Sequence, residues 1–393
     1  MHIIINLQPL LTPLTGIGHY TRELTLALLA QPPEAGVTVE GITGRKREPL
    51  SLDHPLLQTQ SGASIGASER DSPAWQLARR YLRNPLTRKL YRWMCTQRLQ
   101  LTVGQQDALY WEPNYILLPW RGRSVVTVHD LSHERYPAFH PQERVRFFSQ
   151  HLPESLARAT RINVVSQFTA DELQALHGID PKRIDIVPPA VSSRFFVAPE
   201  GQQPQQLRHR YQLPERFLLS VGTLEPRKNL VNVLEAFAAL PLKEQADSPL
   251  LLVGMQGWGE QTYSQRVQHA FQRGTIRRLG YVPSDDLPGL YALAAGFVYV
   301  SLYEGFGMPV VEAMAAGTPV LTANTTATTE VAAGAALEVS PHDVDAIREG
   351  LHRLVADSHD QRIKAGVTRA REFTWEASAE RLLGSFTQAL HSA

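Results

Sequence analysis

The chain has 393 residues, of which 43% are hydrophobic and 20% charged, and its formal net charge at pH 7 is +1. This composition excludes a disordered chain, and the length exceeds the roughly 100–200 residues of one ordinary domain, so we expect two domains with a cleft between them. The single cysteine, Cys95, excludes an internal disulfide and a multi-cysteine metal site, which is typical of proteins in a reducing compartment.

Residues 1–14 are apolar but do not have the pattern of a secretion signal. They lack a basic start and a small-residue cleavage site, and Asn6, Gln8, Pro9 and Pro13 interrupt the apolar run. A buried first strand explains them better. The sequence also contains no run of about 18 apolar residues that could span a membrane. We therefore expect a cytoplasmic protein, in which any membrane contact is peripheral, at the inner face of the cytoplasmic membrane.

Short apolar runs alternate with amphipathic segments, which is the pattern of parallel sheets flanked by helices. In the first half the predicted strands are 3–7, 37–42, 108–111, 125–128, 162–165 and 184–187. In the second half they are 217–221, 250–253, 275–279, 297–300 and 319–321. Residues 188–214 between them are rich in Pro, Gln, Ser and charge and predict a linker. The expected fold class is α/β, with domains at 1–192 and 210–374.

The most informative loop is 301–317, which follows a predicted strand. Ligands of parallel sheets bind beyond the carboxyl ends of the strands, where loops lead into helices. Gly305 and Gly307 leave the loop backbone uncovered, and Pro309 suits a first helical turn, so N–H groups here could face a diphosphate. Glu304 could accept hydrogen bonds from sugar hydroxyls. A glycine-rich turn without a ligand is the alternative for a motif this short.

The complete string 301–317 resembles the signature of glycosyltransferase family 4, which comprises retaining enzymes of the GT-B architecture. In that signature two glutamates are separated by seven residues, as Glu304 and Glu312 are here. The resemblance implies two Rossmann-like domains that face each other across a cleft, with a nucleotide-sugar donor in the C-terminal half. It also implies that Glu304 orients the donor sugar and Glu312 the ribose. The final helix, 375–393, is expected to cross back to the N-terminal domain.

A second loop leads from the strand at 217–221 into a helix for which Asn229 suits the cap. Arg227 and Lys228 lie there at the strand's carboxyl end, where they could bind phosphates. Without other evidence, adjacent basic residues in a loop are usually solvated charges. The string 225–229 resembles the diphosphate-binding segment of the same family. Many members carry an arginine where this chain has Thr223, and Arg227 is the candidate to supply that charge.

Further segments extend the resemblance over nearly the whole chain. They are the glycine loop 16–21, the segment 127–131 with a histidine that points at the donor sugar, and the segments 165–169, 187–191 and 324–330. The resemblance implies the catalytic residues His129, Arg227, Lys228 and Glu304. The implied donor-binding residues are Gly16, Gly18, Ser166, Gly222, Thr223, Gly305, Phe306, Gly307, Met308, Pro309, Val310 and Glu312.

Two acidic patterns allow a metal site as an alternative. One is the cluster His129, Asp130, His133 and Glu134, which lacks the context of a known zinc motif. A locally satisfied structural histidine is a further alternative for His129. The other pattern, Asp343 and Asp345, has the spacing that metal-dependent glycosyltransferases use, but it lies at a predicted helix start, where acidic residues favour the macrodipole. We expect these two aspartates to be structural and the enzyme to need no metal or other cofactor.

The implied reaction releases a nucleoside diphosphate from the donor. Glycosyl transfer passes through a sugar cation-like state while negative charge grows on the leaving phosphate. Arg227, Lys228 and the helix start at Pro309 are expected to neutralise that charge. Retention of the anomeric configuration follows from the family alone. Because the sequence identifies no double-displacement nucleophile, we expect front-face departure and attack, in which a phosphate oxygen takes the acceptor proton.

Residues 72–106 contain no acidic side chain. Their basic residues are Arg79, Arg80, Arg83, Arg88, Lys89, Arg92 and Arg98, and Trp75, Tyr81, Tyr91 and Trp93 lie among them. A basic stretch with interfacial aromatics could bind an anionic bilayer or a lipid diphosphate acceptor, so a membrane- or acceptor-binding role is predicted for residues 79–92. The alternatives are a solvated helix face or a nucleic-acid patch, although no nucleic-acid partner is expected.

The two motif strings resemble those of mannosyltransferases of bacterial surface polysaccharide synthesis, which use GDP-mannose. The expected reaction is therefore the transfer of mannose from GDP-mannose to a growing lipid-linked or polysaccharide glycan, such as the O-antigen of lipopolysaccharide. UDP-glucose, other UDP- or dTDP-sugars and deoxysugar donors stay open. So do an epimerase or phosphorylase on the same fold and a non-catalytic partner subunit of a polysaccharide assembly complex.

Overall fold

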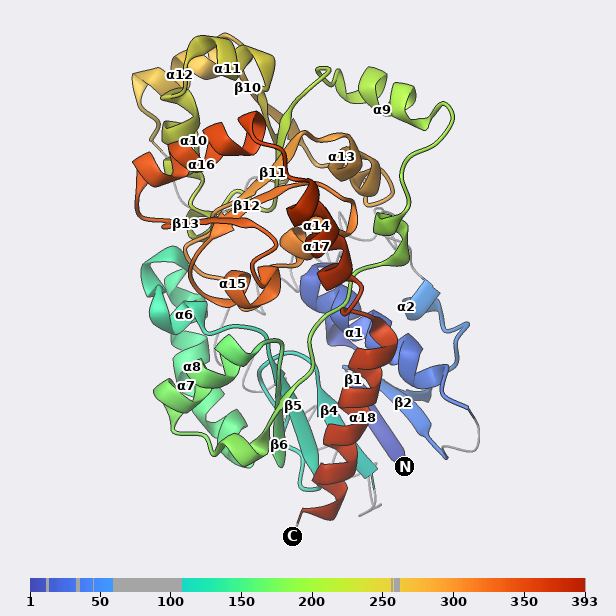
Figure 1. Ribbon diagram of the computed structural model, residues 1–393. Coiled ribbons are helices and arrows are strands. Elements are labelled where there is room, and N and C mark those ends of the chain that lie inside the picture. The colour runs from blue at the N-terminus through green and yellow to red at the C-terminus, as the bar shows by residue number, and fades with distance from the viewer. Residues whose placement is uncertain are drawn as a thin grey trace, which may run out of the picture.

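The computed structural model describes residues 1–11, 14–32, 36–44, 46–58, 108–255, 257 and 262–392. Within these ranges the chain forms two α/β domains, one built on each of two mainly parallel sheets (Figure 1). The predicted fold class is therefore confirmed. The predicted membrane- or acceptor-binding stretch at 79–92 lies outside the described residues and stays a prediction.

The first sheet has the strand order β3-β2-β1-β4-β5-β6-β7 in the described part of the chain. Its strands are β1 (His2–Asn6), β2 (Thr38–Thr43), β3 (Lys46–Pro49), β4 (Ala108–Glu112), β5 (Ser124–Val128), β6 (Arg161–Val164) and β7 (Ile184–Ile186). All neighbours are parallel except β2 and β3. The apolar runs predicted each of these strands except β3, because an edge strand of charged residues has no apolar pattern.

The second sheet is parallel throughout, with the order β10-β9-β8-β11-β12-β13 among the described residues. Its strands are β8 (Leu218–Val221), β9 (Leu250–Val253), β10 (Ile276–Gly280), β11 (Gly296–Tyr299), β12 (Val320–Ala323) and β13 (Leu337–Val339). The three-residue strand β13 is too short to give a pattern and is missing from the prediction. The strand order reverses between β8 and β11, and doubly wound sheets bind ligands beyond the strand ends at such a point.

Helices cover both sheets, and one of them lies inside the predicted linker. The helices are α1 (Gly16–Leu29), α2 (Pro55–Gln58), α6 (Ser132–Arg135), α7 (Gln142–Arg158), α8 (Gln167–His177), α9 (Gln203–Tyr211), α10 (Leu230–Ala238), α11 (Leu242–Asp247), α12 (Gln265–Gln272), α13 (Leu287–Leu293), α14 (Met308–Ala315), α15 (Ala327–Ala332), α16 (Val344–Ala356), α17 (Asp360–Ala370) and α18 (Trp375–His391). Helix α9 packs on α13, and Leu207 is its buried residue. A single buried position makes no amphipathic stripe, so the composition of 188–214 indicated a linker where part of the segment is helical.

The chain crosses between the domains twice. It crosses first after β7 and again between α17 and α18, where the Val191 amide donates to the carbonyl of Phe373 at 3.2 Å. Helix α18 then packs against α1 and strands β4 to β7, with Leu382 and Phe386 completely buried. Figure 1 shows it running along the first domain. The expected return of the final helix to the N-terminal domain is thus confirmed.

Candidate active site

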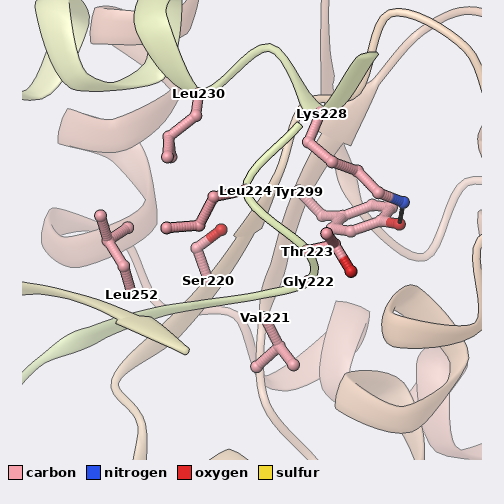
Figure 2. A pocket seen from close by; sticks show the side chains of 9 residues that line it. All are labelled: Ser220, Val221, Gly222, Thr223, Leu224, Lys228, Leu230, Leu252 and Tyr299. Carbon is pink, nitrogen blue, oxygen red and sulfur yellow. Dashed lines mark hydrogen bonds between the residues drawn. The ribbon is translucent and has the colours of Figure 1, made fainter. Parts of the chain in front are cut away.

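A small pocket lies at the carboxyl ends of β8 and β11, where the strand order reverses. Its lining residues come from β8, the loop after it, the start of α10, β9 and β11 (Figure 2): Ser220, Val221, Gly222, Thr223, Leu224, Lys228, Leu230, Leu252 and Tyr299. Three of the predicted site residues, Gly222, Thr223 and Lys228, therefore lie at one pocket. Thr223 is exposed.

The loop after β8 holds Arg227 and Lys228 in a short 3-10 helix, Pro226–Lys228. Asn229 ends this helix in the left-handed conformation, with φ 59°, which asparagine tolerates better than most residues. Its side chain makes no capping hydrogen bond to α10. The side-chain amide donates instead to the carbonyls of Val300 at 3.0 Å and Pro341 at 2.6 Å. Asn229 is thus the N-cap residue of α10, as predicted, but its side chain bonds to the segments after β11 and β13 and not to the helix.

The carboxylate of Glu304 brings the two predicted cations together. Its Oε1 accepts from Lys228 Nζ at 2.7 Å, and its Oε2 accepts from Arg227 Nη1 at 2.8 Å. Arg227 Nη2 also donates to Glu225 Oε1 at 2.7 Å. The buried hydroxyl of Tyr299 donates to the same Oε1 at 2.9 Å. Two loops that are more than 70 residues apart in the sequence thus form one charged cluster.

The cluster is held by mutual charge stabilisation in a poorly hydrated site. Burial by itself raises the pKa of the Glu304 carboxyl, but the charges of Arg227 and Lys228 outweigh burial and hold that pKa at about 2. Burial and the neighbouring guanidinium lower the pKa of Lys228. Burial works against the charge of Arg227, yet Glu304, Asp130 and Glu225 keep its pKa well above the ordinary value. Glu304 and Arg227 are therefore charged at neutral pH.

The loop that carries Glu304 docks on the first domain. The Gly305 carbonyl accepts from the hydroxyls of Ser166 at 2.6 Å and Thr169 at 3.3 Å. The amide of Leu131 donates to the hydroxyl of Tyr303 at 3.3 Å. A Cβ added at Gly305 would lie 1.8 Å from the carbonyl oxygen of His129, so a glycine is needed for close backbone approach. Gly305 thus faces protein here, and its predicted contact with a diphosphate stays a prediction.

Ser166 and Glu330 organise the same interface from the start of α8. Ser166 is buried and caps α8 by accepting from the amide of Thr169. Glu330, from the second domain, accepts from the amides of Gln167 at 2.9 Å and Phe168 at 3.0 Å. A carboxylate at a helix start is favourable because it satisfies free N–H groups there. These contacts give both residues an interdomain role, and the donor-binding role of Ser166 stays a prediction.

His129 lies on the first domain's side of this contact, at the end of β5. Its Nε2 lies 2.8 Å from the carbonyl oxygen of Pro113, and its ring is edge-on to that of Tyr20 from α1, with centroids 5.1 Å apart. Burial lowers the pKa of His129, so the imidazole is neutral at pH 7. Tyr20 belongs to the predicted glycine loop and helix start at Gly16 and Gly18. The structure therefore brings the glycine loop and His129 together.

Glu312, the second glutamate of the signature, lies on α14. Its Oε2 accepts from the hydroxyl of Tyr291 at 2.9 Å, and burial raises the pKa of its carboxyl. Gly307, with φ 102°, is the residue before α14. The other predicted donor-binding residues of this loop follow it or precede it directly: Phe306, Met308, Pro309 and Val310. Of these, Met308 and Pro309 are partly exposed, whereas Phe306 and Val310 are buried.

The acidic patterns that allowed a metal alternative have other contacts. Glu134 lies 3.0 Å from His177 Nε2, and Asp130 accepts from the amide and hydroxyl of Ser132. Asp343 caps α16 by accepting from the amide of Ala346 at 2.9 Å, which fits its predicted structural role. Across the part of the chain that the structure describes, no group of three or more His, Cys, Asp and Glu side chains could hold a metal ion.

Sequence reasoning missed two tyrosines of the site. Tyr299 ends a buried strand and Tyr303 precedes Glu304, so both had the appearance of ordinary core positions. A hydroxyl at the carboxyl end of a strand beside a charged loop is the signal that would have singled out Tyr299.

Among the described residues, no helix is long and apolar enough to cross a membrane.

Comparisons with known proteins identify the family of the chain. A family model described as glycosyl transferases group 1 matches residues 204–369, and one described as Glycosyltransferase Family 4 matches residues 14–195. O-antigen chain mannosyltransferase B of Escherichia coli is 34% identical over 98% of this chain and 99% of its own. This chain belongs to glycosyltransferase family 4. The predicted family and the predicted enzyme class are thereby confirmed.

Other relatives of this family 4 glycosyltransferase match parts or all of it. The serotype-specific mannosyltransferase WbdA of Escherichia coli is 32% identical over 70% of this chain and 34% of its own. Among solved structures, sucrose-phosphate synthase from Thermosynechococcus elongatus has a TM-score of 0.70 at 19% identity and covers 100% of both chains. Anabaena HepE in complex with UDP-glucose has a TM-score of 0.66 at 16% identity, over 99% of this chain and 100% of its own. These structures confirm the GT-B fold.

Proposed function

We propose that this glycosyltransferase moves mannose from GDP-mannose, with retention of anomeric configuration, onto a growing lipid-linked or polysaccharide glycan. The observation that carries the proposed chemistry is that Arg227 and Lys228 both bond to Glu304, with Lys228 lining the pocket beyond β8 and β11. The choice of mannose is supported by relatives named as mannosyltransferases, at 34% and 32% identity.

The proposed reaction rests on charge that is already in place for the leaving diphosphate. Arg227 and Lys228 neutralise the negative charge that grows on the phosphate, which a preorganised cation in a dry site does without reorganisation. Glu304, ionised because its pKa is held at about 2, accepts hydrogen bonds from sugar hydroxyls. The neutral imidazole of His129 faces the sugar from the first domain. The acceptor hydroxyl then attacks the anomeric carbon on the face from which the diphosphate leaves, and a phosphate oxygen takes the proton of that hydroxyl.

The acceptor and the place of action belong to the same proposal. A lipid-linked glycan lies at a membrane surface, so we propose that the enzyme works in the cytoplasm, at the inner face of the cytoplasmic membrane. The basic and aromatic stretch at 79–92 supports this, because such segments bind anionic headgroups. Cosedimentation with anionic vesicles at low salt is expected, and its absence would contradict the membrane contact.

A transfer assay tests the reaction and the donor together. The purified protein is incubated with a mannan-like lipid-linked acceptor and, in parallel, with GDP-mannose, UDP-glucose or a dTDP-deoxysugar, and the product is measured by mass spectrometry. We expect transfer from GDP-mannose, with retention shown by NMR of the new linkage. Transfer from another donor would replace GDP-mannose in the proposal. Binding of nucleotide sugar with no transfer to any acceptor would indicate a non-catalytic subunit.

Lys228→Ala, with Lys243→Ala as its matched control, tests the proposed diphosphate site. Loss of one preorganised charge-stabilising group costs about 10²–10³ in kcat, so we expect a loss of that size with folding intact. Lys243 is exposed on α11 and pairs with Asp247, so Lys243→Ala is expected to leave turnover unchanged. Wild-type turnover in Lys228→Ala would refute the assignment. A thermal-shift panel of nucleotide sugars tests the donor choice, since a ligand at 100 times its Kd adds about 2.7 kcal/mol of stability.

A further inference from the structure

Tyr299 is a buried tyrosine whose hydroxyl lies between two charged groups of the site. The hydroxyl accepts from Lys228 Nζ (Figure 2). It donates to Glu304 Oε1 at 2.9 Å. Nζ lies 4.9 Å from the ring centroid, beyond the hydroxyl and close to the ring plane, so the hydroxyl and not the ring face makes the contact. Only 5% of the residue is exposed. The Tyr299 hydroxyl therefore contacts both Lys228 and Glu304.

We propose that Tyr299 is a positioning residue for glycosyl transfer, which orients the Lys228 ammonium toward the donor diphosphate and the Glu304 carboxylate toward the donor sugar. The inference rests on the proposed function, because that function puts the diphosphate at Lys228. It goes beyond that function by assigning a role to a residue outside the two signature loops, on the strand between them.

The hydrogen bonds of Lys228 support this role. A lysine ammonium has three N–H donors, and among the described residues the hydrogen bonds of Nζ go to Tyr299 and Glu304. These two bonds fix the direction of the third N–H, which is then available for a phosphate oxygen. The negative charge of Glu304 offsets the positive charge of the Lys228 ammonium, whereas the neutral hydroxyl of Tyr299 does not. Tyr299 thus orients Lys228 without reducing its attraction for a diphosphate.

The rigidity of Tyr299 supports the same role. Its ring is stacked on that of Phe297, with centroids 5.9 Å apart and an interplanar angle of 17°. Its carbonyl accepts from the hydroxyl of Thr322 on β12 at 2.9 Å. A tyrosine has two side-chain torsions, whereas lysine has a flexible four-carbon stem. A residue fixed in the sheet can therefore hold a flexible one within the tolerance that transfer requires.

Tyr299→Phe removes the hydroxyl and keeps the aromatic ring. The variant keeps the stacking on Phe297 and leaves the other charged groups of the cluster, Arg227, Glu225 and Asp130, in place. It removes one bond to an ammonium and one to a carboxylate, and charge-assisted bonds are about twice as strong as neutral ones. We expect kcat to fall about 10- to 100-fold, while the KM for the donor changes less than about threefold.

The pH profile gives a readout that a merely structural role would not move. Loss of the accepting hydroxyl disfavours the charged ammonium, so the alkaline limb of kcat is expected to shift to lower pH in Tyr299→Phe. A kcat within twofold of wild type, or an alkaline limb that stays in place, would overturn the inference.

Tyr110→Phe is the matched control. Tyr110 is also buried, and its hydroxyl donates to the Glu112 carboxylate at 2.9 Å, but it lies on β4 of the first sheet. We expect a comparable loss of thermal stability and unchanged kcat. An equal loss of kcat in Tyr110→Phe would mean that destabilisation explains the effect, and it would overturn the inference.

Wild type and Lys228→Ala, measured beside these variants, separate this inference from the proposed function. If wild type transfers no sugar, or if Lys228→Ala keeps full turnover, the proposed function itself fails and the inference fails with it. If Lys228→Ala is impaired and Tyr299→Phe is as active as wild type, the inference alone fails.

Discussion

Replacement of Gly305 by alanine tests whether the loop that carries Glu304 must dock closely on the first domain. The added Cβ would lie 1.8 Å from the His129 carbonyl oxygen and 2.8 Å from the Asp130 Cβ. Real Cβ atoms essentially never approach closer than 3.0 Å, so the loop and the carbonyl must separate by about 1.2 Å, the difference between these limits. The nearest obstacle is backbone, which cannot rotate away as a side chain would.

This displacement sets the size of the expected effect. Overpacking of a closely packed contact costs about 1–3 kcal/mol, so the Tm of Gly305→Ala is expected to fall by several degrees. Glu304 is the adjacent residue, and a misplacement of about 1 Å can cost about 100-fold in rate. We therefore expect kcat/KM to fall about 100-fold, measured by the transfer assay beside thermal unfolding of the same preparations.

Gly384→Ala is the control for this substitution. Gly384 lies within α18, and a Cβ there would meet no atom within 4 Å. Alanine is favoured over glycine inside a helix by about 1 kcal/mol, so this variant should be somewhat more stable and equally active. If Gly305→Ala matched wild type in both Tm and kcat/KM, the two domains would not meet at this glycine as closely as described, and the reasoning would be refuted.

Three further predictions concern pH, helix capping and metal ions. Burial and Arg227 lower the pKa of Lys228, so its charge is lost at a lower pH than the charge of an ordinary lysine, whose pKa is about 10.4. We therefore expect kcat/KM to fall as the pH rises through the lowered pKa. A pH profile of kcat/KM that is flat up to the ordinary lysine pKa would contradict this. Asp343→Ala removes the cap of α16 and should reduce the free energy of unfolding by about 1 kcal/mol in denaturant titrations, with kcat unchanged; unaltered stability would argue against the cap. Transfer should continue in excess EDTA, because Arg227 and Lys228 supply the positive charge; activity lost in EDTA and restored by Mg²⁺ would disprove metal independence.

Much of the fold could be predicted because buried parallel strands are continuous apolar runs. Strands β8 and β11 are of this kind, and the loops after them contain the motifs that located the site. Strand β3 and helix α9 escaped prediction because both are largely polar and pack through few residues. Their formation depends on neighbours that are distant in the sequence, which periodicity does not report.

The charged cluster was predictable as a set of residues but not as a set of contacts. The motifs placed Arg227, Lys228 and Glu304 at strand ends, whereas the pairing of both cations with one carboxylate depends on how two loops meet. Gly305 shows the same limit: its motif suggested an uncovered backbone, and the structure has the other domain against it. Asn229 has the residue type of a helix cap, yet its side-chain amide donates hydrogen bonds to carbonyls of two other segments.

The return of α18 to the first domain has a consequence for the synthesis of this enzyme. Helix α18 supplies Leu382 and Phe386 to the core over β4 to β7, although the rest of that domain precedes residue 192. Chains emerge from the ribosome amino end first, and their early domains usually fold while later ones are still being made. Here the half that is translated first must wait, with one face uncovered, until the whole second half has emerged. A polypeptide whose synthesis stops within the second domain therefore lacks α18, which the first domain needs for its core, and also part of the second domain.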